Sequence, residues 1–128
     1  MALVLGVVGA VIVISLSDWV LFGMLFHDRY DQTPGLWRAI PEGKKIAGSM
    51  VFAVVGTVAY FAAARWLNVS GLSASLALGT FMWLAASLPQ TVTNTLYLRY
   101  SPLLVVSHSI GWLVRLLIAA AAYALVPR

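Results

Sequence analysis

The chain has 128 residues, of which 62% are hydrophobic and only 9% are charged, and its mean hydropathy is +0.94. A soluble globular domain is about half apolar and about a quarter charged, so this composition predicts an integral membrane protein of one domain. The absence of cysteine excludes disulfides, thiolate metal sites and thiol catalysis. The net charge of +4 comes from eight basic and four acidic residues, too few and too scattered for a nucleic-acid surface.

The first apolar segment covers about residues 2–26. It is long enough to cross a bilayer, because a spanning helix needs roughly 20 apolar residues. It lacks the basic start and the small-residue cleavage site of a signal peptide, so we expect a retained transmembrane helix. A polar loop over residues 27–45 follows, in which charges, prolines and Gly35 end the hydrophobic pattern.

Three further segments qualify as spanning helices, at about residues 46–67, 71–97 and 102–126. The connections "NVSG" and "RYSP" between them are short, so consecutive helices should be antiparallel neighbours. The predicted fold is therefore an all-α membrane protein with four transmembrane helices in an antiparallel bundle.

Small residues form a stripe along the second predicted helix, at Ser49, Ala53, Gly56 and Ala63. Small side chains at helical spacing let two helix backbones approach closely. Tight packing inside one bundle is the favoured interpretation of this stripe, and a face for self-association is the alternative.

Basic residues predict the orientation of the chain in its membrane. The loop over residues 27–45 and the last connection hold five of them, whereas the opposite ends of the helices hold two. Basic residues accumulate in cytoplasmic loops, so we expect the loop over residues 27–45 to be cytoplasmic and both termini to be outside.

A few strongly polar side chains interrupt the spans at comparable depths, and we expect them to form one buried cluster towards the cytoplasmic half. Asp18 is the only acidic residue in any span, and Arg115 is the only basic residue in the interior of one. A lone charge inside a bilayer is costly, so these two side chains are predicted to pair. The pair either fixes helix packing or serves a function. The predicted cluster consists of Asp18, Gln90, Asn94, His108, Trp112 and Arg115.

Pro89 lies in the third span, beside Gln90. Proline frees the carbonyl four residues earlier, here that of Ala85, and kinks the helix. Inside a bilayer the freed carbonyl must find a partner in the protein or in a wet cavity. A tolerated proline satisfied by Ser87 or by a water is at least as well supported as a gating hinge.

The chemistry of these residues leaves three classes of function open. No nucleophile–base arrangement, glycine-rich phosphate loop or metal-ligand set is present, so no catalytic or metal residue is predicted and no cofactor is indicated. The first class is an accessory or small-ligand-binding membrane subunit without catalysis. The alternatives are a small oligomeric transporter or channel that uses Asp18, His108 and Arg115, and a membrane enzyme on a lipophilic substrate. The expected partners are the bilayer and either further copies of the chain or a larger membrane complex, but no nucleic acid.

Two stretches resemble a known family. The segment "TNTLYLRYSPLLVVSHSIGWLVRLLIAAAAYAL", and "SDWVLFGMLFHDRY" followed by "LWR", resemble small bacterial membrane proteins grouped as domain of unknown function 1761. The matching features are an Asn before a short loop and a Gly-aromatic pair in the last helix, here Asn94, Gly111 and Trp112. The resemblance implies a four-helix protein of a bacterial inner membrane but supplies no catalytic residues.

Overall fold

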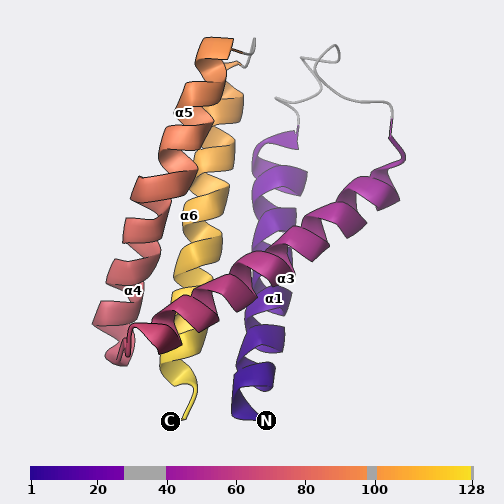
Figure 1. The fold of residues 1–128 in the computed structure, drawn as a ribbon. Coiled ribbons are helices and arrows are strands. Elements are labelled where there is room, and N and C mark those ends of the chain that lie inside the picture. The colour runs from indigo at the N-terminus through magenta and orange to yellow at the C-terminus, as the bar shows by residue number, and fades with distance from the viewer. Residues whose placement is uncertain (28–39, 98–100, 128) are drawn as a thin grey trace.

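A computed structural model of the chain describes residues 1–27, 40–97 and 101–127 (Figure 1). Within these ranges the chain folds into helices, and four continuous stretches of helix are long and apolar enough to cross a membrane. The predicted all-α fold with four transmembrane helices is thus confirmed. The elements are α1 (Ala2–Val20), the π-helix η1 (Leu21–Leu25), α3 (Glu42–Trp66), α4 (Gly71–Met82), the π-helix η3 (Trp83–Ser87), α5 (Leu88–Tyr97) and α6 (Pro102–Leu125).

The second span begins earlier than the sequence pattern predicts. Helix α3 starts at Glu42, and the carbonyl of Pro41 accepts bonds from the backbone N–H groups of Lys44 and Lys45 at 2.9 and 3.3 Å. Residues 42–45, predicted to belong to the polar loop, therefore form the first turn of α3. Charged residues mark where the apolar pattern ends, but helical hydrogen bonding continues past that point to the proline. Residues 28–39 of the predicted loop lie outside the described residues.

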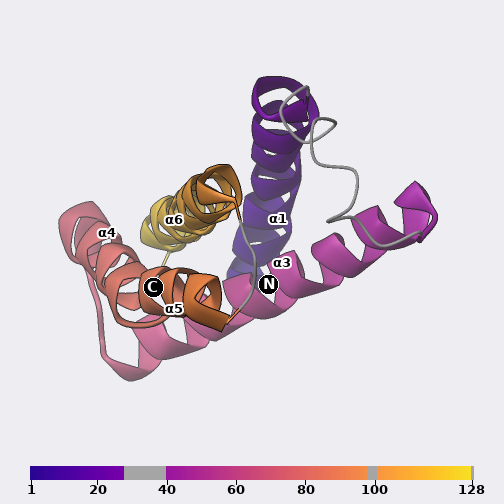
Figure 2. The same cartoon turned by 90° about the horizontal axis from the view of Figure 1, so that it is seen from above.

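Helix α6 lies at the centre of the molecule and packs against α1, α3, α4 and α5. Figure 1 shows α1, α6 and the α4–η3–α5 stretch running alongside one another, with both termini at the same end. Helix α3 crosses these helices obliquely, and the view from above in Figure 2 shows its first half leading away from them. Residues 43–52 of α3 are accordingly exposed. Residues 46–52 of this half are mostly apolar, so their surroundings in a membrane are lipid or another apolar surface.

The turn between α3 and α4 is closed by backbone hydrogen bonds. The N–H of Val69 donates to the carbonyl of Ala64 at 2.9 Å, and the N–H of Asn68 donates to that of Arg65 at 3.1 Å. This pairing is the Schellman motif, which requires a left-handed residue just after the helix. Asn68 supplies that residue with φ of 53°. The short turn then sends the chain back as α4.

The hydrophobic core lies in the half of the molecule that carries the termini, where α3, α4 and α6 meet. Tyr60 is fully buried, and its hydroxyl donates to the carbonyl of Ser75 in α4 at 2.6 Å. The rings of Tyr60 and Phe61 meet Tyr123 edge-to-face, with centroids 6.3 and 5.3 Å away. This packing fixes the end of α3 against α4 and α6. The buried core residues are Tyr60, Phe61, Ala64, Leu116, Ala119 and Ala120.

The small-residue stripe of α3 packs within the chain at its middle. Ala53 is only 4% exposed, and a Cβ on Gly56 would lie 3.6 Å from the Trp112 ring of α6. Ser49, by contrast, is exposed on the first half of the helix. The structure therefore supports the packing interpretation for Ala53 and Gly56, which let α3 cross close to α6.

The two π-helical turns are features that the sequence pattern does not predict. Each adds a residue to a turn and so rotates the side chains that follow, relative to a continuous α-helix. The turn η1 ends the first span, and η3 directly precedes the segment that contains Pro89. In η3 the backbone N–H of Leu88 bonds to the carbonyl of Trp83, so the hydrogen bonding of this helix already departs from the α pattern one residue before Pro89.

Candidate functional site: the Asp18–Arg115 ion pair

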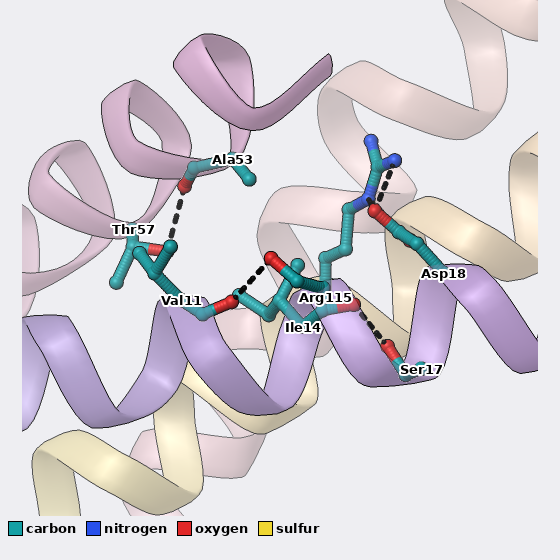
Figure 3. A network of polar contacts seen from close by, with 8 residues as sticks. Val11, Ile14, Ser17, Asp18, Ala53, Thr57 and Arg115 are labelled. Carbon is teal, nitrogen blue, oxygen red and sulfur yellow. Dashed lines mark hydrogen bonds and ion pairs between the residues drawn. The ribbon is translucent and has the colours of Figure 1, made fainter. Parts of the chain in front are cut away.

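The ion pair predicted from the sequence is present in the structure. Asp18 comes from α1 and Arg115 from the middle of α6. Arg115 Nε donates to Asp18 Oδ1 at 2.9 Å, and Arg115 Nη2 donates to Asp18 Oδ2 at 2.7 Å (Figure 3). Such two-pronged contacts between guanidinium and carboxylate combine charge with fixed geometry. The pair therefore ties the first helix to the last one.

Both side chains of the pair are largely enclosed, at 16% exposure each. An unpaired charge inside a membrane protein is unfavourable by several kcal/mol, whereas a close pair offsets much of the desolvation of its members. Asp18 and Arg115 also cancel each other's formal charge. The site is thus a net-neutral dipole.

The hydroxyl groups near the pair are occupied by their own helices. Ser17 donates to the carbonyl of Ile14 and Thr57 to that of Ala53, each at 2.8 Å (Figure 3). Ser15 likewise donates to the carbonyl of Val11. Each of these hydroxyls uses its hydrogen on the preceding turn of its own helix, so none of them donates to Asp18. Asp18 is therefore the hydrogen-bond partner of Arg115 in the described part of the chain.

An aromatic ring completes the surroundings of Arg115. Its Cζ atom lies 5.1 Å from the ring centroid of Trp112, within the range of a cation–π contact. Beside these two residues is a cavity of about 10 Å³, room for about one water. Its other walls include Ile14 of α1 and Phe52, Ala53 and Gly56 of α3.

The other predicted cluster residues, His108, Gln90 and Asn94, differ in how they are placed relative to the pair. His108 packs its ring against Phe22, with centroids 5.7 Å apart. Gln90 is exposed and Asn94 half-buried on α5. In residues 1–27, 40–97 and 101–127, no hydrogen bond or ion pair joins His108, Gln90 or Asn94 to the pair, but the positive charge of Arg115 acts on the His108 imidazole through space. Direct contacts thus join Asp18, Trp112 and Arg115, His108 lies within the electrostatic influence of Arg115, and Gln90 and Asn94 lie on α5 without a polar contact to the pair in the described part of the chain.

Two contacts that hold α6 near the site were not predicted. Phe22 lies against the backbone of Gly111, and Trp83 Nε1 donates to the carbonyl of Ser109 at 2.9 Å. A signal for the first existed in the sequence, because glycine in a helix interior is unfavourable and often marks a close contact. Both contacts lie within two turns of Arg115 on α6 and restrict its position.

The described residues offer no group of three His, Cys, Asp or Glu side chains that could hold a metal ion. No family model, curated protein or solved structure matches the chain. Function is therefore inferred from the chemistry of the site itself.

Proposed function

We propose that the chain is a non-catalytic membrane subunit in which the Asp18–Arg115 pair holds α1 against α6. The observation that carries this proposal is the two-pronged geometry of the pair, with Nε and Nη2 both engaged by one carboxylate. The adjoining cavity has room for about one water, which supports a closed site and not a substrate chamber. The exposed apolar helices supply the surface on which such a subunit meets other membrane segments.

The alternative function for the Asp18–Arg115 pair is transport. A transporter that used Asp18 and Arg115 would have to separate them in each cycle and admit water from both sides. The packing of Ile14, Leu116 and Ala119, each 7% exposed or less, argues against a continuous wet path at this level. The closed pair therefore favours the subunit over the transporter.

The protein reconstituted in liposomes that contain a pH-sensitive dye tests this choice. Under an imposed pH gradient and with a potassium ionophore, proton flux should equal that of protein-free vesicles. It should also equal the flux with the neutral variant Asp18→Asn/Arg115→Gln. A flux that exceeds the vesicle background and disappears in the neutral variant would contradict the proposal and favour a transporter.

A complementary experiment tests the subunit role itself. The chain should be extracted from native membranes in polymer-bounded lipid discs, without detergent, and its mass and composition determined. A second protein at fixed stoichiometry is the expected result. Particles that contain this chain alone at every expression level would contradict an accessory role.

The proposed location is a bacterial inner membrane, with the termini outside and the segment over residues 27–45, predicted as a loop, at the cytoplasmic side. The excess of basic residues at the loop end of the helices supports this orientation. The resemblance to the domain of unknown function 1761 group stays a prediction, and it agrees with the bacterial location.

Ala2→Cys should react with an impermeant thiol reagent in intact cells, and Gly35→Cys should not. The opposite labelling pattern would reverse the orientation.

A further inference from the structure

One edge of the Arg115 guanidinium is left open by the ion pair. A guanidinium carries five N–H donors in a fixed planar fork. Asp18 engages Nε and one hydrogen of Nη2, which leaves both hydrogens of Nη1 and the second one of Nη2. Throughout the described ranges no residue accepts a hydrogen bond from Nη1, and Figure 3 shows the second terminal nitrogen without a dashed line.

This open edge reaches the surface of the molecule. In the described part of the chain, no fully buried side-chain nitrogen or oxygen lacks a partner, so Nη1 is not sealed inside. Arg115 also forms part of the wall of the small cavity beside Trp112. A group that approaches from outside can therefore meet Nη1.

The position along α6 decides what surrounds this edge. Arg115 lies 13 residues after Pro102 and 10 residues before Leu125, the ends of the helix, so it is about 15 Å from the nearer end. The hydrocarbon core of a bilayer is about 30 Å thick. The open edge therefore faces the bilayer interior and not a water interface. A donor in that environment is unfavourable unless it finds an acceptor.

Charge then selects the class of acceptor. Asp18 already neutralises Arg115, so a carboxylate or phosphate ligand would bring an uncompensated negative charge into a medium of low dielectric. A neutral carbonyl oxygen accepts the same hydrogen bonds without that charge. Phospholipid ester carbonyls are held at the interface, whereas a free lipid-soluble carbonyl compound enters the hydrocarbon interior.

The geometry points to a binding site at the open edge of Arg115 for a neutral, lipid-soluble ketone or quinone. Arg115, Trp112 and Phe52 share the wall of the cavity of about 10 Å³, so a ligand bound at the open edge of Arg115 would lie beside apolar side chains. Phe52 forms part of the wall and is 65% exposed, so it offers apolar surface to the body of the ligand. The ring of Trp112 provides a second apolar face beside the guanidinium. The inference rests on the closed Asp18–Arg115 pair of the proposed function.

Photolabelling with benzophenone, itself a neutral lipophilic ketone, tests the site. The intact chain in lipid nanodiscs is irradiated with benzophenone, and adducts are mapped by mass spectrometry. We expect adducts at the cavity wall, on Phe52 or Trp112. An excess of 2-undecanone should reduce them about tenfold, because the ketone competes for a hydrogen bond to a charged donor. The matched hydrocarbon n-undecane should leave them unchanged.

A pair of variants connects the labelling to Arg115. Asp18→Leu/Arg115→Met removes both charges at similar volume and should lower labelling at Phe52 and Trp112 about tenfold. Arg65→Met, at an exposed position near the end of α3, should leave it unchanged. If the first variant does not fold, the competition between 2-undecanone and n-undecane in the unmodified chain still tests whether a ketone binds at the open edge of Arg115.

Three results would overturn the inference. They are the absence of adducts at the cavity wall, equal competition by n-undecane, and undiminished labelling of the folded Asp18→Leu/Arg115→Met variant. The first means that a water occupies the open edge. These failures are distinct from failure of the proposed function, because the liposome flux assay contains no ketone. If adducts form and the liposome assay also shows a proton flux that depends on the Asp18–Arg115 pair, only the subunit proposal is overturned.

Discussion

The ring of Phe22 lies against the backbone of Gly111, so close that a Cβ on Gly111 would be 2.6 Å from the ring atom Cζ. Phe22 belongs to η1 and Gly111 to α6, one helical turn from Arg115. The close approach of the two helices at this glycine and the ion pair next to it restrain the same interface. This relationship explains why a residue without a side chain is needed on this face of α6.

Gly111→Ala should lower the free energy of unfolding by about 2 kcal/mol, because the added methyl group overpacks the contact with Phe22. The measurement is unfolding of the purified chain in mild detergent, followed by circular dichroism. Gly48→Ala is the matched control, since nothing lies within 4 Å of a Cβ on Gly48. Its stability should stay the same or rise slightly, because alanine favours helix. Equal losses in both variants would show that the Phe22 contact does not limit residue 111.

Tyr60→Phe should destabilise the protein by about 1 kcal/mol. The substitution keeps the buried ring but removes the hydroxyl that donates to the carbonyl of Ser75, which links α3 to α4. Tyr97→Phe serves as the control, because Tyr97 is 82% exposed at the end of α5. Thermal melting of the two variants under identical conditions makes the comparison. A Tyr60→Phe variant as stable as the control would mean that the hydrogen bond adds nothing to the packing of the ring.

The turn after α3 should discriminate between two substitutions of Asn68. The residue has φ of 53°, a conformation that glycine adopts readily and a β-branched residue does not. Asn68→Gly is expected to keep the stability of the parent, whereas Asn68→Val should lose about 1–2 kcal/mol. Both are measured by melting in the same detergent. If valine were tolerated as well as glycine, the left-handed turn would not be required for folding.

The four spans could be predicted from the sequence because hydropathy reports directly on burial in lipid. The Asp18–Arg115 pair was predictable for a related reason: each is the sole charge of its sign in the interior of a span, and each needs a partner. The first turn of α3 was missed, since polarity marks the membrane edge and not the start of the helix.

The wider polar cluster was predicted from side-chain spacing within the third and fourth spans, and such spacing does not fix how two helices are rotated towards each other. The π-helical turn η3 interrupts the α-helical period of the third span before Leu88. Such a turn depends on packing between helices, here including the bond from Trp83 to Ser109, and local sequence carries little signal for it. The oblique course of α3 has the same kind of origin, because it follows from where Ala53 and Gly56 meet α6.

A double-mutant cycle on the ion pair tests the central claim, that Asp18 and Arg115 act as one unit joining α1 to α6. The variants are Asp18→Asn, Arg115→Gln and their combination, with Arg65→Gln as an exposed control. Unfolding free energies are measured in lipid bicelles. Each single variant should lose about 3 kcal/mol, because it leaves a buried charge without its partner. The double variant should lose at least about 1.5 kcal/mol less than the sum of the two. Losses that add within about 0.5 kcal/mol would contradict the coupling and, with it, the role assigned to the pair.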